Sequence, residues 1–216
     1  REKVKLEDQA AKGSVLEIIN DDKPFRIGVI DIPNFYVDFE GQRNGDGSYK
    51  STTKDVKKIL DSLKIENVDG VIIDLREDGG GSLQEAIELT GLFIKDGPVV
   101  QVKNSDGNIE VAKDPDPSIV YEGPLAVLVN RFSASASEIF SGAIQDYGRG
   151  LVIGEQTFGK GTVQNLIDLN RLSSQKNLSL GQVKLTIAKY YRVNGGSTQN
   201  LGVIPDISFP TMIDPH

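Results

Sequence analysis

The stretch Leu125-Ala-Val-Leu-Val-Asn-Arg-Phe-Ser-Ala-Ser-Ala-Ser-Glu-Ile-Phe140 decides the fold class. It opens with an apolar run typical of a buried strand and crosses a turn over residues 130–135. It then places Ile139, Phe140 and Ala143 at helical spacing. A strand, a turn of small residues and a helix form the repeating unit of a layered α/β protein.

The same unit occurs twice earlier in the chain. Residues 26–32 and 71–75 are apolar and β-branched, as in buried strands. Residues 40–51, which contain three glycines, predict a mobile excursion, and Thr52 is the predicted N-cap of a helix. A second helix is predicted through residues 86–92. Its start carries Ser82 and Glu85 at capping-box spacing.

Strands dominate the rest of the chain. They are predicted over residues 150–154, 162–169 and 182–191, and a last strand around residues 205–210. Asn194-Gly-Gly-Ser197 is typical of a hairpin turn. We therefore expect one α/β domain over residues 1–216, cut from a longer protein.

Composition excludes several classes of function. The 216 residues are 38% hydrophobic and carry a net charge of −7, with the cations scattered, so no nucleic-acid surface is expected. No apolar run reaches the roughly 18 to 20 residues that span a bilayer. Cysteine is absent and the only histidine is His216. Zinc and thiolate chemistry are therefore not expected, whereas an oxygen-ligand site for Ca²⁺ or Mg²⁺ stays open.

Ser135 is the candidate nucleophile, because a helix start after a strand presents backbone N–H groups that stabilise an oxyanion. A serine nucleophile needs a base, and without an interior histidine a neutral lysine is the available proton acceptor. The alternative is structural: Ser135 and Glu138 also fit a capping box.

Lys160 is the candidate base. Phe158 precedes its glycine-flanked position, and burial in an apolar pocket lowers a lysine pKa. Gln164 lies four residues on, where a strand side chain could orient the lysine. Residues 154–160 also match the front of a phosphate-binding loop, but Gly161 takes the place of the required Ser or Thr, and a strand is predicted where that loop needs a helix.

Several motifs together resemble the carboxy-terminal processing peptidases of family S41, also called the tail-specific type. They extend over nearly the whole chain: Lys5-Leu-Glu-Asp-Gln-Ala-Ala-Lys12, Ile72-Ile-Asp-Leu-Arg76, Gly79-Gly-Gly81, Arg131-Phe-Ser-Ala-Ser-Ala-Ser-Glu138, Gln145-Asp-Tyr-Gly148, Thr157-Phe-Gly-Lys-Gly-Thr-Val-Gln164 and Tyr191-Arg-Val-Asn-Gly-Gly-Ser-Thr-Gln199.

The resemblance implies a serine endopeptidase on an α/β core similar to the Clp-protease and crotonase fold, with a mixed sheet and layered helices. It makes Ser135 the nucleophile, Lys160 the general base and Gln164 the residue that positions the lysine. The backbone N–H groups of Gly81 and Ala136 become the oxyanion donors. No cofactor is implied.

The resemblance also implies protein substrates with apolar C-terminal tails, a periplasmic location, and a substrate-recruiting PDZ domain that is not recognisable in these residues. A core without that domain could be slow or inactive. Two other functions stay open: a peptide-binding core that does not cut, and a nucleotide enzyme that uses residues 154–160.

Overall fold

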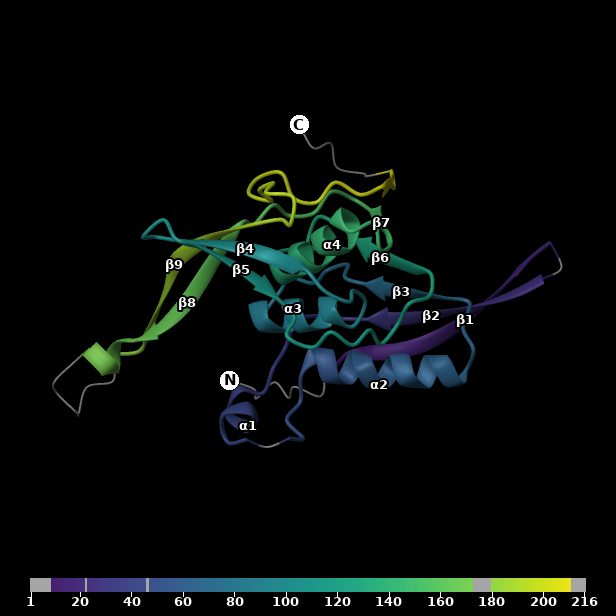
Figure 1. Ribbon diagram of the computed structural model, residues 1–216, viewed down its shortest axis with the longest axis horizontal. Helices are drawn as coiled ribbons and strands as arrows, with labels where there is room; N and C mark the ends of the chain where they lie inside the picture. Colours follow the sequence, from purple (N-terminus) through teal and green to yellow (C-terminus); the bar gives the residue numbers. More distant parts are fainter. Residues whose placement is uncertain (1–8, 22, 46, 173–179, 211–216) are drawn as a thin grey trace.

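The computed structural model describes residues 9–21, 23–45, 47–172 and 180–210. Part of the Lys5 to Lys12 motif, most of the polar stretch at 171–181, and His216 lie outside them. The described chain forms two sheets with helices packed between and beside them (Figure 1). Within the described ranges, no helix has the length and apolar character needed to cross a membrane.

The first sheet has six strands in the order β1-β2-β3-β6-β7-β10. β1 and β2 form an antiparallel hairpin, and every pairing from β2 to β10 is parallel. A parallel sheet gathers the loops after its strands at one edge, where α/β proteins build their sites. The strands are β1 (Lys12–Asn20), β2 (Lys23–Asp31), β3 (Gly70–Asp74), β6 (Leu125–Val129), β7 (Leu151–Gly154) and β10 (Ile207–Ser208).

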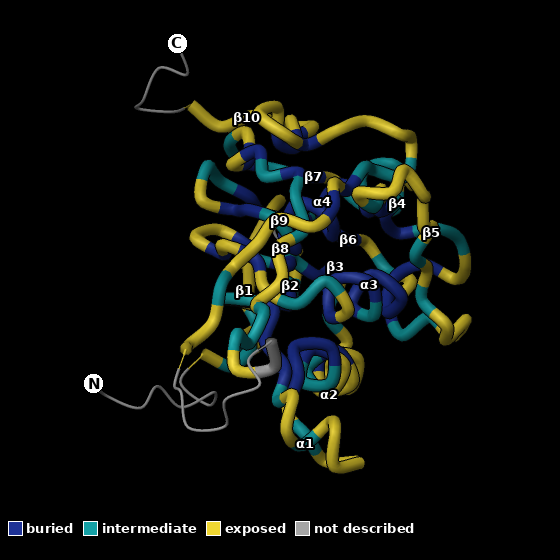
Figure 2. Tube along the Cα trace, turned by 90° about the vertical axis from the view of Figure 1, so that its left-hand side faces the viewer, coloured by how far each residue is buried: buried dark blue, intermediate teal, exposed yellow. Residues whose placement is uncertain are grey.

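The second sheet is antiparallel, in the order β5-β4-β9-β8. β8 and β9 extend away from the core as an arm (Figure 1). No residue of β8 is buried and most of β9 is exposed, whereas β3, β6 and α4 are largely buried (Figure 2). The strands are β4 (Pro98–Asn104), β5 (Ile109–Lys113), β8 (Thr162–Asp168) and β9 (Gln182–Tyr191).

Three helices pack in a row, α2 against α3 and α3 against α4. α2 also contacts β1 and β2, while α4 contacts β7 of the first sheet and β4 of the second. α4 therefore links the two sheets. The helical segments are α1 (Phe39–Arg43), α2 (Thr52–Ile65), α3 (Leu83–Gly91), α4 (Ala136–Asp146) and the 3₁₀ turn η2 (Leu169–Leu172).

The core lies between the parallel sheet and this row of helices. Ile73, Val127 and Phe140 are fully buried, and Phe140 meets Phe93 edge to face with ring centroids 5.8 Å apart. Burial of each such side chain contributes about 1.5 to 3 kcal/mol. The strand, turn and helix at residues 125–146 are thus held by packing against the parallel sheet and against the neighbouring helices.

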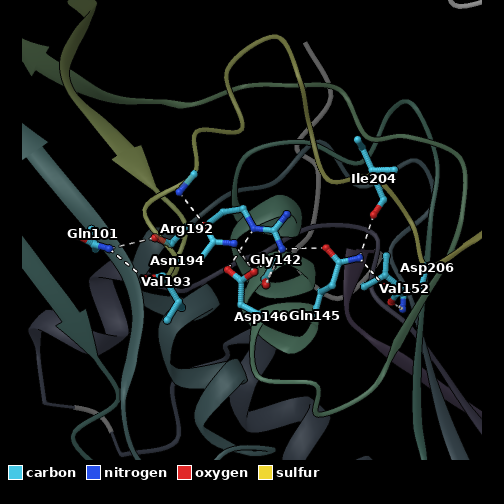
Figure 3. Close-up of polar contacts among 11 residues, drawn as sticks. Gln101, Gly142, Gln145, Asp146, Val152, Arg192, Val193, Asn194, Ile204 and Asp206 are labelled. Carbon is cyan, nitrogen blue, oxygen red and sulfur yellow. Dashed lines mark hydrogen bonds and ion pairs between the residues drawn. The ribbon is translucent and has the colours of Figure 1, made fainter.

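A polar network fixes the far end of α4 (Figure 3). The Arg192 guanidinium, just past β9, binds Asp146 at 2.6 Å and donates to Gln145 at 2.8 Å. Gln145 donates to Asp206, whose other oxygen accepts the Val152 N–H. The network therefore joins α4 to β9, β7 and the segment before β10.

The fold class and the main strand and helix predictions are confirmed, with local corrections. The N-cap of α2 is Ser51 rather than Thr52, because the Thr52 hydroxyl accepts the Tyr36 N–H instead. Residues 40–51 are not wholly irregular, since α1 covers their start. The turn after Asn194 forms, but no strand follows it directly, so the hairpin prediction is wrong. The strands β1, β4 and β5 were not predicted.

Candidate active site

Ser135 occupies a strained turn between β6 and α4. Its backbone has φ 58° and ψ −110°, a conformation that residues other than glycine rarely adopt. Such strain costs about 1 to 3 kcal/mol and persists where surrounding contacts fix it. A serine on a sharp strand-to-helix turn has its hydroxyl presented outward, as in the nucleophile elbows of hydrolases.

The turn is held by the loop that follows β3. The Ala134 N–H and the Ser137 hydroxyl both donate to the Asp78 carbonyl at 2.9 Å, and the Ser133 hydroxyl donates to the Leu75 carbonyl at 2.8 Å. Ser133 and Ser137 are fully buried, so these bonds lie within the core. The serines on either side of Ser135 are therefore structural.

The predicted oxyanion donors lie beside this turn. A Cβ placed on Gly80 would come within 2.8 Å of the Ser135 Cβ and 3.0 Å of the Ala136 nitrogen, so only glycine permits this approach. The flanking segment is fixed to Phe35, which donates to the Gly80 carbonyl and accepts from Ser82. Neither the Gly81 nor the Ala136 N–H has an acceptor among the described residues. The glycine loop thus meets the serine turn at Gly80, and both predicted donors are unpaired within the described chain.

Asp78 is a fully buried acid in the same loop. Its Oδ1 accepts the Gly80 N–H at 2.7 Å, whereas Oδ2 has no partner in the described part of the chain. Burial raises the pKa of Asp78 to about 7, with a further rise from Asp31 and an opposing effect of the Gly80 hydrogen bond.

Glu138 connects the serine turn to the lysine loop. Its Oε2 accepts the N–H groups of both Ser135, at 2.8 Å, and Lys160, at 2.9 Å. Its Oε1 accepts from the Thr157 hydroxyl and the Gly159 N–H, each at 2.7 Å. Burial raises the pKa of this carboxyl, and the four hydrogen bonds oppose the rise. One carboxylate oxygen therefore binds the backbones of both Ser135 and Lys160 and sets the distance between them.

Tyr190 makes the matching contact with the carbonyl groups. Its buried hydroxyl lies within hydrogen-bonding distance of the carbonyl oxygens of Ser135 and Lys160 and donates most closely to Lys160. Burial raises the Tyr190 pKa, so the hydroxyl keeps its proton. Ser135 and Lys160 are thereby fixed through both their N–H and carbonyl groups.

The Lys160 side chain is half-buried, and burial lowers its pKa; the nearby charge of Lys184 adds to this, and Glu138 opposes it. Among the described residues, no hydrogen bond joins the Lys160 ammonium to Ser135 Oγ or to Gln164. Gln164 is exposed on β8 and, with Lys160, lines a cavity of about 650 Å³. The structure brings the Ser135 and Lys160 backbones together but does not form the side-chain contacts that the sequence predicted.

Residues 154–160 do not have the structure that a phosphate-binding loop requires. Residues 155–161 run from β7 directly into the strand β8, not into a helix. The Lys160 N–H, one of the groups that would cradle a phosphate, is occupied by Glu138. The loop therefore lacks both features that phosphate binding needs.

The sequence predictions missed three residues of this site, namely Asp78, Glu138 and Tyr190. Only Glu138 left a signal, the Ser-x-x-Glu spacing that was interpreted as a capping box. That prediction is confirmed, because α4 begins with a capping box in which Glu138 accepts the Ser135 N–H. Its second role, the contact with Lys160, spans 22 residues and has no local pattern.

Comparisons with known proteins identify the family of the chain. The model of peptidase family S41 matches residues 26–209. The chain is 49% identical over 214 residues to the tail-specific protease of Haemophilus influenzae, covering 99% of this chain and 28% of that protein. It is 38% identical to the carboxy-terminal-processing protease of Bartonella bacilliformis, covering 70% of this chain and 33% of that one.

Among solved structures, the photosystem II D1 C-terminal processing protease superposes with a TM-score of 0.72 at 26% identity. The match covers 92% of this chain and 48% of that structure. The chain thus spans about a third or less of the two curated relatives and about half of this structure. From the family match and these identities, the chain belongs to peptidase family S41.

Proposed function

We propose that this chain is the catalytic core of a serine endopeptidase of the tail-specific, carboxy-terminal processing type. One observation carries the proposal. Ser135 lies on a strained turn that Gly80 approaches closely, and the N–H groups of the adjoining Gly81 and of Ala136 have no acceptor within the described residues. Unpaired donors close to a serine hydroxyl are what acyl transfer requires.

In the proposed mechanism, neutral Lys160 takes the proton of Ser135 and the alkoxide attacks the scissile carbonyl. The Gly81 and Ala136 N–H groups stabilise the oxyanion of the tetrahedral intermediate. Protonated Lys160 returns its proton to the leaving amine, and water then hydrolyses the acyl-enzyme. Gln164 positions Lys160. The lowered pKa of Lys160 supports its part as a base.

The substrates we propose are proteins recognised by apolar C-terminal tails, and the proposed location is the periplasm. Family membership and the relatives named as tail-specific and carboxy-terminal-processing proteases support the reaction class. We propose that recruitment of substrates involves the whole protein, since this chain covers 28% of the Haemophilus protein.

One observation favours the alternative, a peptide-binding core that does not cut. Ser135 Oγ and the Lys160 ammonium share no hydrogen bond in the described structure. In the proposed enzyme this contact forms when substrate is bound, since catalytic hydrogen bonds often tighten only in the complex.

Covalent labelling of the full-length protein separates the two functions. A fluorophosphonate probe should modify Ser135, located by peptide mass mapping. Ser135→Ala and Lys160→Arg should abolish both labelling and peptide cleavage, since a guanidinium cannot act as the base. The exposed pair Ser62→Ala and Lys95→Arg serve as matched controls that keep both. Labelling or cleavage retained by Ser135→Ala or Lys160→Arg would contradict the dyad.

A further inference from the structure

The cavity of about 650 Å³ beside Lys160 has an unusual lining. Lys160, Gln164 and Lys189 contribute to its wall together with uncharged polar side chains such as Gln199 and Asn200. No acidic side chain lines it. The wall therefore carries the Lys189 ammonium and the proposed base Lys160, and no anion.

The cations continue along the second sheet. Lys189 on β9 lies opposite Thr162 of β8 on one side and opposite Lys103 of β4 on the other. Lys103 and Lys189 also line a second cavity of about 310 Å³, again without an acidic side chain. Tyr191 borders both cavities, so the two spaces adjoin along β9.

This arrangement is costly for the protein alone. Like charges directly opposite each other on neighbouring strands are destabilising. Among the described residues, neither Lys103, Lys184 nor Lys189 has an ion-pair partner, in a chain with 31 acidic and 24 basic residues. A cleft lined by one sign of charge concentrates ligands of the opposite sign. The missing counter-charge points to a ligand.

We infer that the cavity beside Lys160 is a subsite for a carboxylate of the substrate peptide, with Lys189 as its main specificity-determining residue and Lys103 as the second. The inference rests on the proposed function, because it makes the ligand part of the peptide that is cut. The carboxylate comes either from an Asp or Glu side chain near the scissile bond or from the free C-terminus of a short leaving segment.

The test uses the full-length protein and matched fluorogenic peptides. One series carries Asp or Asn in turn at each of three positions on either side of the scissile bond. A second series carries a free or an amidated C-terminus. The expected result is a kcat/KM roughly two- to fivefold higher for one acidic peptide, the range of an exposed ion pair. The preference should fall as salt rises.

Lys189→Gln should reduce that ratio to about one, and Lys103→Gln should reduce it in part. The control Lys95→Gln removes an exposed lysine that lines neither cavity and should leave the ratio unchanged. Loss of preference only in the Asp series identifies a side-chain carboxylate, and loss only in the amide series identifies the C-terminus. Equal ratios for wild type and Lys189→Gln in both series would overturn the inference.

Binding measured in a Ser135→Ala background separates this inference from the proposed function. Fluorescence anisotropy with the same peptides needs no catalysis. If the wild type does not cleave but the Ser135→Ala protein still prefers the acidic peptide through Lys189, the subsite stands and the proposed reaction fails. If cleavage occurs with no charge preference in rate or binding, the reaction stands and the subsite fails.

Discussion

Ser135 lies between the parallel sheet and α4, where its neighbours are buried, whereas Lys160 leads into β8, a strand of the second sheet with no buried residue. The serine side is fixed by buried hydrogen bonds from three neighbouring residues of its own turn. On the lysine side, the backbone is fixed through Glu138 and Tyr190, but the side chain faces a cavity.

The difference separates two tasks. Oxyanion donors must be placed before the reaction, because their orientation supplies the stabilisation. A base must exchange protons and meet different substrates, so its surroundings can be more open. Glu138, Tyr190 and Arg192 are the connections between the two regions, and the variants below test each side and the links between them.

Arg192→Met should have the largest effect on the free energy of unfolding. It leaves Asp146, whose side chain is 7% exposed, without its cation, and it cuts the link from α4 to the end of β9. Breaking a buried pair from one side costs about 3 to 5 kcal/mol, measurable by urea unfolding. The control Lys64→Met, in an exposed pair with Asp61, should cost less than about 1 kcal/mol. Equal losses of unfolding free energy in the two variants would mean that the Arg192 network does not stabilise the fold.

Asp78→Asn should change how stability depends on pH on the serine side. The folded pKa of Asp78, about 7, lies above the ordinary aspartate value of 3.8. Between these values the unfolded chain releases the proton that the folded chain keeps, so wild-type stability falls as pH rises from about 4 to 7 and then levels off. The full difference corresponds to about 4 kcal/mol.

The asparagine variant lacks that titration. Its stability relative to wild type should therefore rise from pH 4 to pH 7, with the pH 4 value as the internal reference. Parallel stability curves for the two proteins over this range would show that Asp78 is ionised in the folded state, and the serine side would then contain a buried charge.

Glu138→Gln should weaken the link itself. The new NH₂ group should take the place of Oε1, because the Thr157 hydroxyl can accept a hydrogen bond whereas the N–H groups of Ser135 and Lys160 cannot. The Gly159 N–H then loses its acceptor and the other bonds lose their charge, for about 1.5 to 3 kcal/mol. We also expect kcat/KM of the full-length protein to fall at least tenfold. Glu85→Gln removes another buried acid, which binds the Thr53 N–H, and should destabilise without that loss of activity. An equal loss of activity in both variants would mean that Glu138 stabilises the fold and does not position the reactive residues.

The smallest effect on the free energy of unfolding is expected from replacing Ser135 itself. Ser135→Gly and Ser135→Ala both remove the hydroxyl, but only glycine adopts a φ of 58° without strain. Relief of about 1 to 3 kcal/mol outweighs the entropy cost of glycine, about 0.5 to 1 kcal/mol. The glycine variant should therefore be more stable than the alanine variant by about 1 kcal/mol in urea unfolding. The reverse order would mean that the turn is not strained.

The sequence predicted best the elements whose partners are local or whose burial is complete. β6 and β9 have the predicted bounds, because apolar or alternating runs between turn residues report a strand directly. β1 and β5 are largely exposed and show no such pattern. Their place is set by pairing with β2 and β4, which a local reading does not detect.

The site divides in the same way. Ser135, Lys160 and the glycine loop stood out because each sits in a distinctive local pattern. Tyr190 looks like any aromatic residue of a strand, and its contact with Lys160 spans 30 residues. Ser82 caps α3 as predicted, but the Glu85 side chain binds the start of α2 instead of closing its own capping box. Where a buried acid finds its donors depends on tertiary packing.

The carboxylate of Glu138 also makes the spacing of Ser135 and Lys160 independent of the number of residues between them in the sequence. Because Ser135 and Lys160 are spaced through one oxygen atom, the turn joining α4 to β7 does not set their separation. The distance between the two backbones is therefore set by a side chain that contacts both, and not by the residues that lie between them in the sequence.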